Sequence, residues 1–331
     1  MAGWNLKRGV ITDYDATEEQ YRSLFNYVLS EACRKRNTYK FGLIKSILDN
    51  LFNGEELEQG ILLSYEQLFE KFAENYWNLV VKYDLRQMRR DGRSQYSKIE
   101  TILRGEAEKE GIVAEIEYDL LDDATKERLA KSVTSECKKY VIGALYEDFD
   151  GILYSFDQNG VGLCLAPRAY RFMLKYKIEI EKLNYYSWAK FLETINTDDA
   201  IIRVIEKLEL ATPKRSNLSV YRELLQSEFE ESNCFYCGKK LRKSTHVDHF
   251  IPWSFTKDDK VWNLVLSCPT CNIGKSNRIP SKALLNKLME RNRQFGSCAN
   301  TTIQKDFQSY EENKFKDMWN YAKNSGFKEM D

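Results

Sequence analysis

Two cysteine pairs enclose both histidines of the chain, and these residue types at this spacing are suited to metal chemistry. The four thiols belong to Cys234, Cys237, Cys268 and Cys271, so each pair has two residues between its members. Zinc in a structural site takes four ligands in a tetrahedron, and two such pairs supply four thiolates. We therefore predict a Zn²⁺ ion that is fully enclosed by the four cysteines, stabilises the fold and takes no part in chemistry.

Two alternatives to this zinc site are open. The eight cysteines of the chain could form disulfides, but a cytoplasmic chain keeps its thiols reduced, and the cytoplasm is the location that we expect. His246 and His249 are three residues apart and could replace two thiols, as in a finger with mixed ligands. Because four thiolates already fill the zinc shell, we favour the four-cysteine site.

The segment between the cysteine pairs carries an acid, a base and amide side chains. Asp248 offers a hard carboxylate oxygen that suits Mg²⁺, and Asn272, directly after the second pair, can add a neutral oxygen ligand. His249 is a candidate general base, because a histidine side chain ordinarily titrates near neutrality. Asn263 can form a hydrogen bond that orients His249. Together these groups suit hydrolysis of a phosphodiester bond, which needs an activated water, a base and a cation.

The local backbone constrains how these groups can cooperate. The stretch from Thr245 to Ile251, ended by Pro252, is typical of a strand. Adjacent residues of a strand point to opposite faces, so Asp248 and His249 can serve one site only through a local distortion or a metal at the strand edge.

The stretch from Cys234 to Ile279 resembles the HNH endonuclease family. It is similar in spacing to the HNH domain of RNA-guided CRISPR effector nucleases and to stand-alone bacterial HNH enzymes of restriction and anti-phage defence. The resemblance is carried by three runs, His246-Val-Asp-His-Phe-Ile-Pro, Trp262-Asn-Leu and Cys268-Pro-Thr-Cys-Asn-Ile-Gly-Lys-Ser.

The resemblance implies a ββα-metal fold and a role for each motif residue. It implies that His249 is the general base, that Asp248 and Asn272 bind the catalytic divalent ion, and that Asn263 is the middle asparagine that positions the base. Because the last motif position is Asn272 and not a third histidine, it favours Mg²⁺ or Mn²⁺ as that ion.

Two further residues are candidate contacts to nucleic acid. Lys275 follows the motif closely and could hold a phosphate as a point charge, although a solvent-exposed lysine fits the pattern nearly as well. His246 falls where several relatives carry an acid or another polar residue, and we count it with Lys275.

Composition describes an ordinary soluble protein with an uneven charge. The 331 residues are 43% hydrophobic and 30% charged, enough for two or three domains, and we expect neither a secretory signal nor a membrane span. Residues 234–331 hold 17 basic and 10 acidic side chains, whereas residues 1–233 hold 33 and 40. A basic segment around the motif suits a polyanionic substrate, and a solvated basic face would give the same counts.

We predict two domains. Residues 1–225 are expected to form a mainly helical domain for targeting or assembly, with a small β-hairpin at 151–165 around Asp157-Gln-Asn-Gly160. The predicted helices cover 17–37, 64–83, 124–146 and 167–195, and residues 211–217 are the best linker. Residues 226–331 are expected to form an α+β domain with cysteine knuckles, strands at 234–241 and 245–251, and helices at 281–294 and 303–324.

A basic run in the first domain has two interpretations. It consists of Arg86, Arg89, Arg90, Arg93 and Lys98. A solvated turn is the default for such a run, and a loop that contacts phosphates is the sharper alternative.

The leading functional hypothesis is an HNH endonuclease that cuts DNA, in bacterial restriction or anti-phage defence. One rival is a zinc-dependent nucleic-acid-binding protein without catalysis, which would need no base. Another is a nuclease subunit that is active only with a protein partner, or as a homo-oligomer, bound through the helical domain.

Overall fold

The computed structural model describes residues 5–90, 94–112, 115–211, 218–229, 232–242, 244–295 and 300–330. The chain divides into two compact units, residues 1–214 and 215–331, which we call the N-terminal and C-terminal units. This division precedes the boundary predicted after residue 225, and the predicted linker lies outside the described residues except for Ala211. In the described parts of the chain, every helix is too short or too polar to cross a bilayer.

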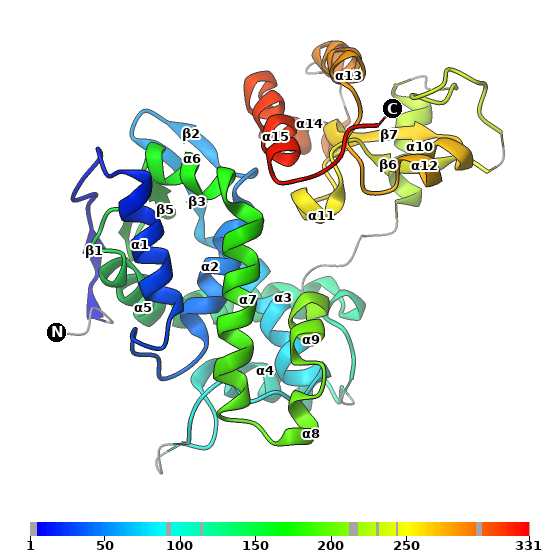
Figure 1. The fold of residues 1–331 in the computed structure, drawn as a ribbon. Coiled ribbons are helices and arrows are strands. Elements are labelled where there is room, and N and C mark those ends of the chain that lie inside the picture. The colour runs from blue at the N-terminus through cyan, green and yellow to red at the C-terminus, as the bar shows by residue number, and fades with distance from the viewer. Residues whose placement is uncertain are drawn as a thin grey trace. The chain divides into compact units, whose positions relative to one another are not determined.

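The N-terminal unit is mainly helical and carries one five-stranded antiparallel sheet (Figure 1). Its helices are α1 (Glu18–Leu29), α2 (Tyr39–Asn50), α3 (Tyr65–Trp77), α4 (Lys98–Lys109), α5 (Asp123–Asp148), α6 (Pro167–Lys175), α7 (Lys177–Glu193), α8 (Asp198–Ile201) and α9 (Val204–Ala211). Its strands are β1 (Arg8–Gly9), β2 (Glu55–Leu57), β3 (Gly60–Ser64), β4 (Tyr154–Asp157) and β5 (Gly162–Leu165).

The predicted hairpin is the centre of this sheet. Strands β4 and β5 pair with each other, and the turn between them is closed by the Gly160 N–H, which donates to the Asp157 carbonyl at 3.0 Å. The hairpin is not isolated, because β1 pairs with β4, and β3 pairs with β5 and β2. Strands β1, β2 and β3 were not predicted, because segments of two to five residues show too little alternation of apolar and polar residues.

Helix starts followed the sequence signals better than helix ends. Thr17 is the N-terminal cap of α1 and Ser64 is that of α3. Each forms a capping box with the glutamine three residues later. The helix predicted to continue to Asn37 ends at Leu29, because the following segment turns and pairs with residues near Met88. The long helix predicted over 167–195 is two helices, interrupted at Tyr176.

The core of the N-terminal unit lies where α3 packs against α2 and α5, with α7 against α2. Nearly every residue of α2 is buried. Gly42 permits this packing, since a Cβ atom there would lie 2.4 Å from the Tyr76 ring and 2.7 Å from the Phe72 ring. Those two rings stack at 4.2 Å, so they leave little room to move.

The C-terminal unit is built around a two-stranded sheet. Its strands are β6 (His246–His249) and β7 (Leu264–Ser267), and its helices are α10 (Ser219–Ser227), α11 (Trp253–Thr256), α12 (Pro269–Lys275), α13 (Lys282–Phe295), α14 (Thr301–Phe307) and α15 (Glu312–Asn324). A short 3₁₀ turn, η4 (Val261–Asn263), leads into β7. Helix α12 follows β7 directly, which gives the order β-β-α.

The expected ββα order of elements is therefore correct, but one of the two predicted strands is wrong. The second predicted strand contains β6, but its partner is β7, in register from His246 opposite Ser267 to His249 opposite Leu264. The predicted strand at 234–241 makes only one isolated bridge, between Asn233 and Lys240. A tight cysteine turn occupies that stretch, and a turn cannot also extend as a strand.

A substitution at Gly42 tests the close approach of α2 and α3. We expect Gly42→Ala to destabilise the N-terminal unit by about 1–3 kcal/mol, because the added methyl group has no space. Gly105 in α4 is the matched control, since a methyl group added there would have nothing within 4 Å. Gly105→Ala should raise stability by up to about 1 kcal/mol through helix propensity. Thermal unfolding measures the stability of both variants. A Gly42→Ala protein as stable as wild type would contradict the close packing of α2 on α3.

Candidate functional site

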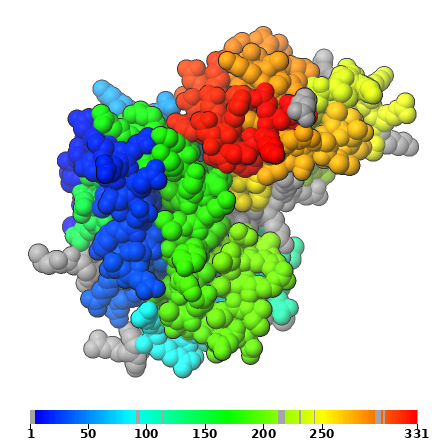
Figure 2. Space-filling model, in the orientation of Figure 1, coloured from blue at the N-terminus to red at the C-terminus, as the bar shows by residue number. Residues whose placement is uncertain are grey.

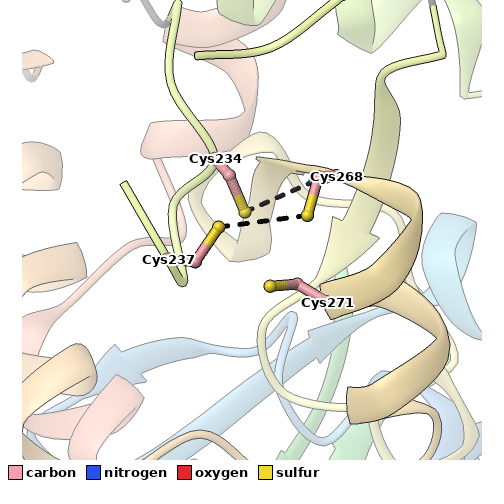
Figure 3. Close-up of side chains that lie close together, drawn as sticks. All are labelled: Cys234, Cys237, Cys268 and Cys271. Carbon is pink, nitrogen blue, oxygen red and sulfur yellow. Dashed lines mark hydrogen bonds between the residues drawn. The ribbon is translucent and has the colours of Figure 1, made fainter. Parts of the chain in front are cut away.

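The four predicted zinc ligands converge in the C-terminal unit. The sulfur atoms of Cys234, Cys237, Cys268 and Cys271 all lie within 4.8 Å of one another and point toward a common centre (Figure 3). The sulfurs of Cys237 and Cys268 are 3.9 Å apart. Four thiolates at about 2.3 Å around a tetrahedral zinc would be separated by about 3.8 Å, so the cluster fits this ion.

Local backbone structure brings the two pairs together. In the first pair, the Gly238 N–H donates to the Cys234 carbonyl at 2.8 Å, and Gly238 has φ of 70°, which favours glycine. In the second pair, Cys268 is the residue that caps α12, and Pro269 follows at the first helical position. The Phe235 N–H donates to the Leu266 carbonyl at 2.9 Å, which ties the first turn to β7.

The surroundings act in opposite directions on the pKa of two of the thiols, Cys234 and Cys271. Burial acts to raise the pKa of Cys234, but backbone N–H groups around it outweigh burial and lower that pKa to about 7. Burial and the neighbouring cysteine side chains raise the pKa of Cys271 instead. Several thiolates in such a small space repel one another, and a divalent cation removes that repulsion.

A second group of polar side chains gathers between β6 and α12. The Asn272 amide donates to His246 Nδ1 at 3.0 Å, and the Tyr236 hydroxyl donates to the Asp248 carboxylate at 2.7 Å. His246 and Asp248 are two apart on β6 and so share one face of the strand. The structure thus brings Asp248 and Asn272, the two predicted ligands of a catalytic ion, to the same side of the hairpin, with His246 between α12 and the strand.

Lys275 belongs to this group, and it is enclosed. Its side chain is 1% exposed, its amine donates to the His249 carbonyl at 2.7 Å, and it lies 3.3 Å from the Asp248 carboxylate. Burial and the Asp248 carboxylate raise the pKa of Tyr236, so its phenol stays protonated and donates. Asp248 therefore has one cationic and one neutral donor, and the Lys275 charge faces inward and not toward solvent.

His249 lies apart from that group. It is 2% exposed, and its Nε2 atom is 2.6 Å from the Asp259 carboxylate. By strand alternation its ring shares a face with Val247, which packs against the apolar core of the unit. Asp248 and His249 thus make their contacts on opposite faces of β6, as the sequence predicted. The Lys275 amine is near both residues, because it contacts the Asp248 carboxylate and the His249 backbone carbonyl.

Asn263 acts on the backbone that follows His249. Its amide donates to the Ile251 carbonyl at 3.0 Å and accepts from the Ile251 N–H at 2.9 Å, while its own carbonyl accepts from the Phe250 N–H at 2.7 Å. Asn263 is buried in η4, and η4 is held by Asp306 of α14, whose carboxylate accepts from the Val261 N–H at 2.9 Å. Asn263 thus fixes the course of the chain after β6.

The sequence pattern missed two residues that complete the site. Tyr236, which bonds Asp248, stands inside the first cysteine pair, where an aromatic residue gives no signal of its own. Asp259, which bonds His249, is one of two consecutive acids in an otherwise basic segment, and that contrast was the available signal.

Comparison with known families agrees with this geometry. Residues 234–281 match the family model of HNH endonucleases, so this segment carries an HNH-type nuclease domain. The matched segment contains both cysteine pairs, strands β6 and β7, and helix α12. No curated protein and no solved structure matches the chain. The match supports a nuclease-type function, a nucleic-acid substrate and the use of divalent metal.

The zinc assignment predicts that one cysteine is enough to disrupt the C-terminal unit. Cys268→Ser removes a thiolate that lies near both sulfurs of the first pair, so the protein should lose zinc and the unit should unfold. Cys164→Ser is the control, because this cysteine lies in β5 outside the cluster. Zinc content by mass spectrometry and limited proteolysis report the two effects. A stable Cys268→Ser protein with a full complement of zinc would refute the assignment.

Proposed function

We propose that this protein is a DNA endonuclease that hydrolyses phosphodiester bonds with His249 as general base and one divalent ion, in bacterial restriction or anti-phage defence. The observation that supports it most is the motif match over residues 234–281, in which Asp248 and Asn272 lie on one side of the β6–β7 hairpin. The defence role rests on the resemblance to stand-alone HNH enzymes alone.

The donor set suits a hard divalent ion. Asp248 supplies an anionic oxygen and Asn272 a neutral one, which are ligand types of Mg²⁺ and Mn²⁺. Such an ion would stabilise the negative charge that develops on the phosphate and the leaving oxygen. The amine of Lys275 lies 3.3 Å from Asp248, so a cation at this carboxylate also meets a neighbouring positive charge. Lys275 would then limit how tightly the ion is held, and it contributes positive charge near the phosphate.

His249 is prepared to accept a proton. A carboxylate accepts hydrogen bonds and does not donate them, so the hydrogen between His249 and Asp259 belongs to Nε2, and Nδ1 is left as the basic atom. Asp259 holds the ring in this tautomer and stabilises the imidazolium that forms when a water gives up its proton. When DNA binds, the buried His249 ring would gain access to the water that it deprotonates.

One observation favours the second candidate, a nucleic-acid-binding protein without catalysis. His249 is enclosed and already bonded to Asp259, and Lys275 already neutralises Asp248. Both candidates bind nucleic acid and contain zinc, so cleavage of plasmid DNA in the presence of Mg²⁺ or Mn²⁺ separates them.

The role of His249 predicts a catalytic defect without a folding defect. His249→Ala keeps the cysteines and the proposed metal ligands, so zinc content and DNA binding should persist while cleavage falls by roughly 10² to 10⁴. His246→Ala is the matched control: it removes the chain's other histidine, whose ring accepts a hydrogen bond from Asn272, and should cost less. Plasmid nicking over time measures both. Near-normal cleavage by zinc-containing His249→Ala would exclude this histidine as the base.

The role of Asn272 predicts a defect that responds to metal. Asn272→Ala should lower cleavage, and raising the Mg²⁺ or Mn²⁺ concentration should restore part of it, because the lost group is a ligand and not a proton acceptor. His249→Ala should show no such rescue. Asn286→Ala, at an exposed asparagine of α13, is the control for loss of an amide. Titration of Mn²⁺ by its electron paramagnetic resonance signal gives an independent readout, and unchanged Mn²⁺ affinity in Asn272→Ala would remove this residue from the ligand set.

A further inference from the structure

Two cavities of the N-terminal unit adjoin and gather positive charge. One has a volume of about 600 Å³ and is lined by α1, the loop after it and α7; the other, also about 600 Å³, is lined by residues 86–90 and 194–197. Both include Arg89 and Thr194, so we treat them as one feature, the basic groove. The cations that line it are Arg34, Lys35, Arg86, Arg89, Arg90 and Lys190. Among the described lining residues, Glu31 is the only acid.

The groove exists because two segments about 50 residues apart are paired. Asn37 forms an antiparallel bridge with Met88, and the Thr38 N–H donates to the Gln87 carbonyl at 3.0 Å. This pairing lays the basic residues after α1 beside those of residues 86–90. Helices α1 and α7, which lie side by side on the face seen in Figure 2, form the wall of the first cavity.

Buried polar contacts hold the basic segment in place. Asn196 donates to the Arg86 carbonyl at 3.1 Å and accepts from the Arg86 N–H at 2.8 Å. The Gln87 side chain is fully buried and accepts from the Thr38 hydroxyl at 2.8 Å. A charge run that serves only solubility needs no such anchoring, because it gains nothing from a fixed conformation. These contacts favour a recognition surface over a solvated turn.

The cations of the groove differ in how far a ligand could reach them. Lys35 donates to the Ser30 and Cys33 carbonyls and Arg86 to the Gln95 carbonyl, whereas Arg34, Arg89 and Arg90 are exposed. Arg89 contacts neutral groups in the described structure, the Thr194 hydroxyl at 3.4 Å and the face of Phe191 at 5.5 Å. Arg34 and Arg90 are exposed, whereas Lys190 is paired with Glu193 at 2.9 Å. The N-terminal part of the chain is acidic overall, so this local excess of cations is not a consequence of composition.

An exposed aromatic ring stands beside these cations. Tyr186 of α7 lines the first cavity, together with Arg34, Arg89 and Lys190, and is 56% exposed. Proteins that bind single-stranded nucleic acid combine a positive groove for the backbone with aromatic side chains on which unpaired bases stack. A duplex keeps its bases stacked on each other and would use only the positive charge.

We propose that the basic groove binds an unpaired stretch of nucleic acid, with Arg89 and Arg90 on the phosphodiester backbone and Tyr186 against a base. This inference rests on the proposed function, because it gives the nuclease a strand-binding surface on its helical unit. It assigns Arg89 and Arg90 of the basic run to phosphate contact. Arg93 of that run lies outside the described residues.

Binding to a fluorescently labelled single-stranded DNA oligonucleotide tests the groove. The full chain is used in the His249→Ala background, so that the strand is not cut. The double variant Arg89→Ala/Arg90→Ala should bind at least tenfold more weakly. The slope of log affinity against log salt should fall by about 1.4, or about 0.7 for each lost phosphate contact on a single strand. Arg171→Ala, at an exposed arginine of α6 outside the groove, should leave both quantities unchanged.

A second variant tests the stacking. Tyr186→Ala should weaken binding of the single strand about tenfold and leave duplex binding unchanged, whereas the double arginine variant should weaken both. Equal affinities of the double arginine variant and Arg171→Ala, in proteins with equal melting temperatures, would overturn the proposal. The proposal would also be overturned if a mononucleotide displaced the oligonucleotide while neither the double arginine variant nor Tyr186→Ala changed the affinity for the single strand.

The outcome is separable from that of the proposed function. Wild-type protein that cuts plasmid DNA while the groove variants bind normally refutes the groove alone. Groove variants that lose strand binding, in a protein whose wild type cuts nothing under any divalent ion, support the groove and refute the nuclease assignment.

Discussion

The convergence of four thiols is the constraint on which the C-terminal unit depends. Strands β6 and β7 have four residues each, and a hairpin of that size is marginal by itself in water. The cysteine cluster brings the turn that precedes β6 to the helix that follows β7, so a metal bound there would cross-link the two. Helix α12 then presents Asn272 toward β6 because Cys268 and Cys271 fix its start.

Charge pairing is the second organising feature of this unit. Asp248 is paired with Lys275, and His249 with Asp259, and all four side chains lie mostly out of solvent. Removing Lys275 would leave the Asp248 carboxylate as an uncompensated buried charge, and the Asp259 carboxylate holds the His249 ring by a hydrogen bond. The two pairs hold Asp248 and His249 on opposite faces of one short strand, and the Lys275 amine donates to the His249 carbonyl.

The N-terminal unit holds a basic surface segment against a densely packed core. Its core is filled by aromatic side chains of α2, α3 and α7, packed at close range around Gly42. The segment from Arg86 to Arg90 is fixed by hydrogen bonds of its Gln87 side chain to Thr38 and of its Arg86 backbone to Asn196. A surface loop anchored in this way keeps its arginines in place before a ligand arrives, which lowers the entropy lost on binding.

The sequence by itself determined the cysteine cluster, the resemblance to HNH nucleases and the start of several helices. Residue type and spacing were enough to predict the cysteine cluster and to place Asp248 on a strand and Asn272 on a following helix, because these signals are local. The helix starts predicted at Thr17 and Ser64 are correct for the same reason, since both residues cap their helices. Only the tertiary structure decided which strand pairs with β6, that Lys275 faces inward, and that Asp259 and Tyr236 complete the site. It also decided that Arg34 and Arg89 line one groove. These features depend on contacts between residues distant in sequence, and hydrophobic periodicity carries no information about which distant polar groups will meet.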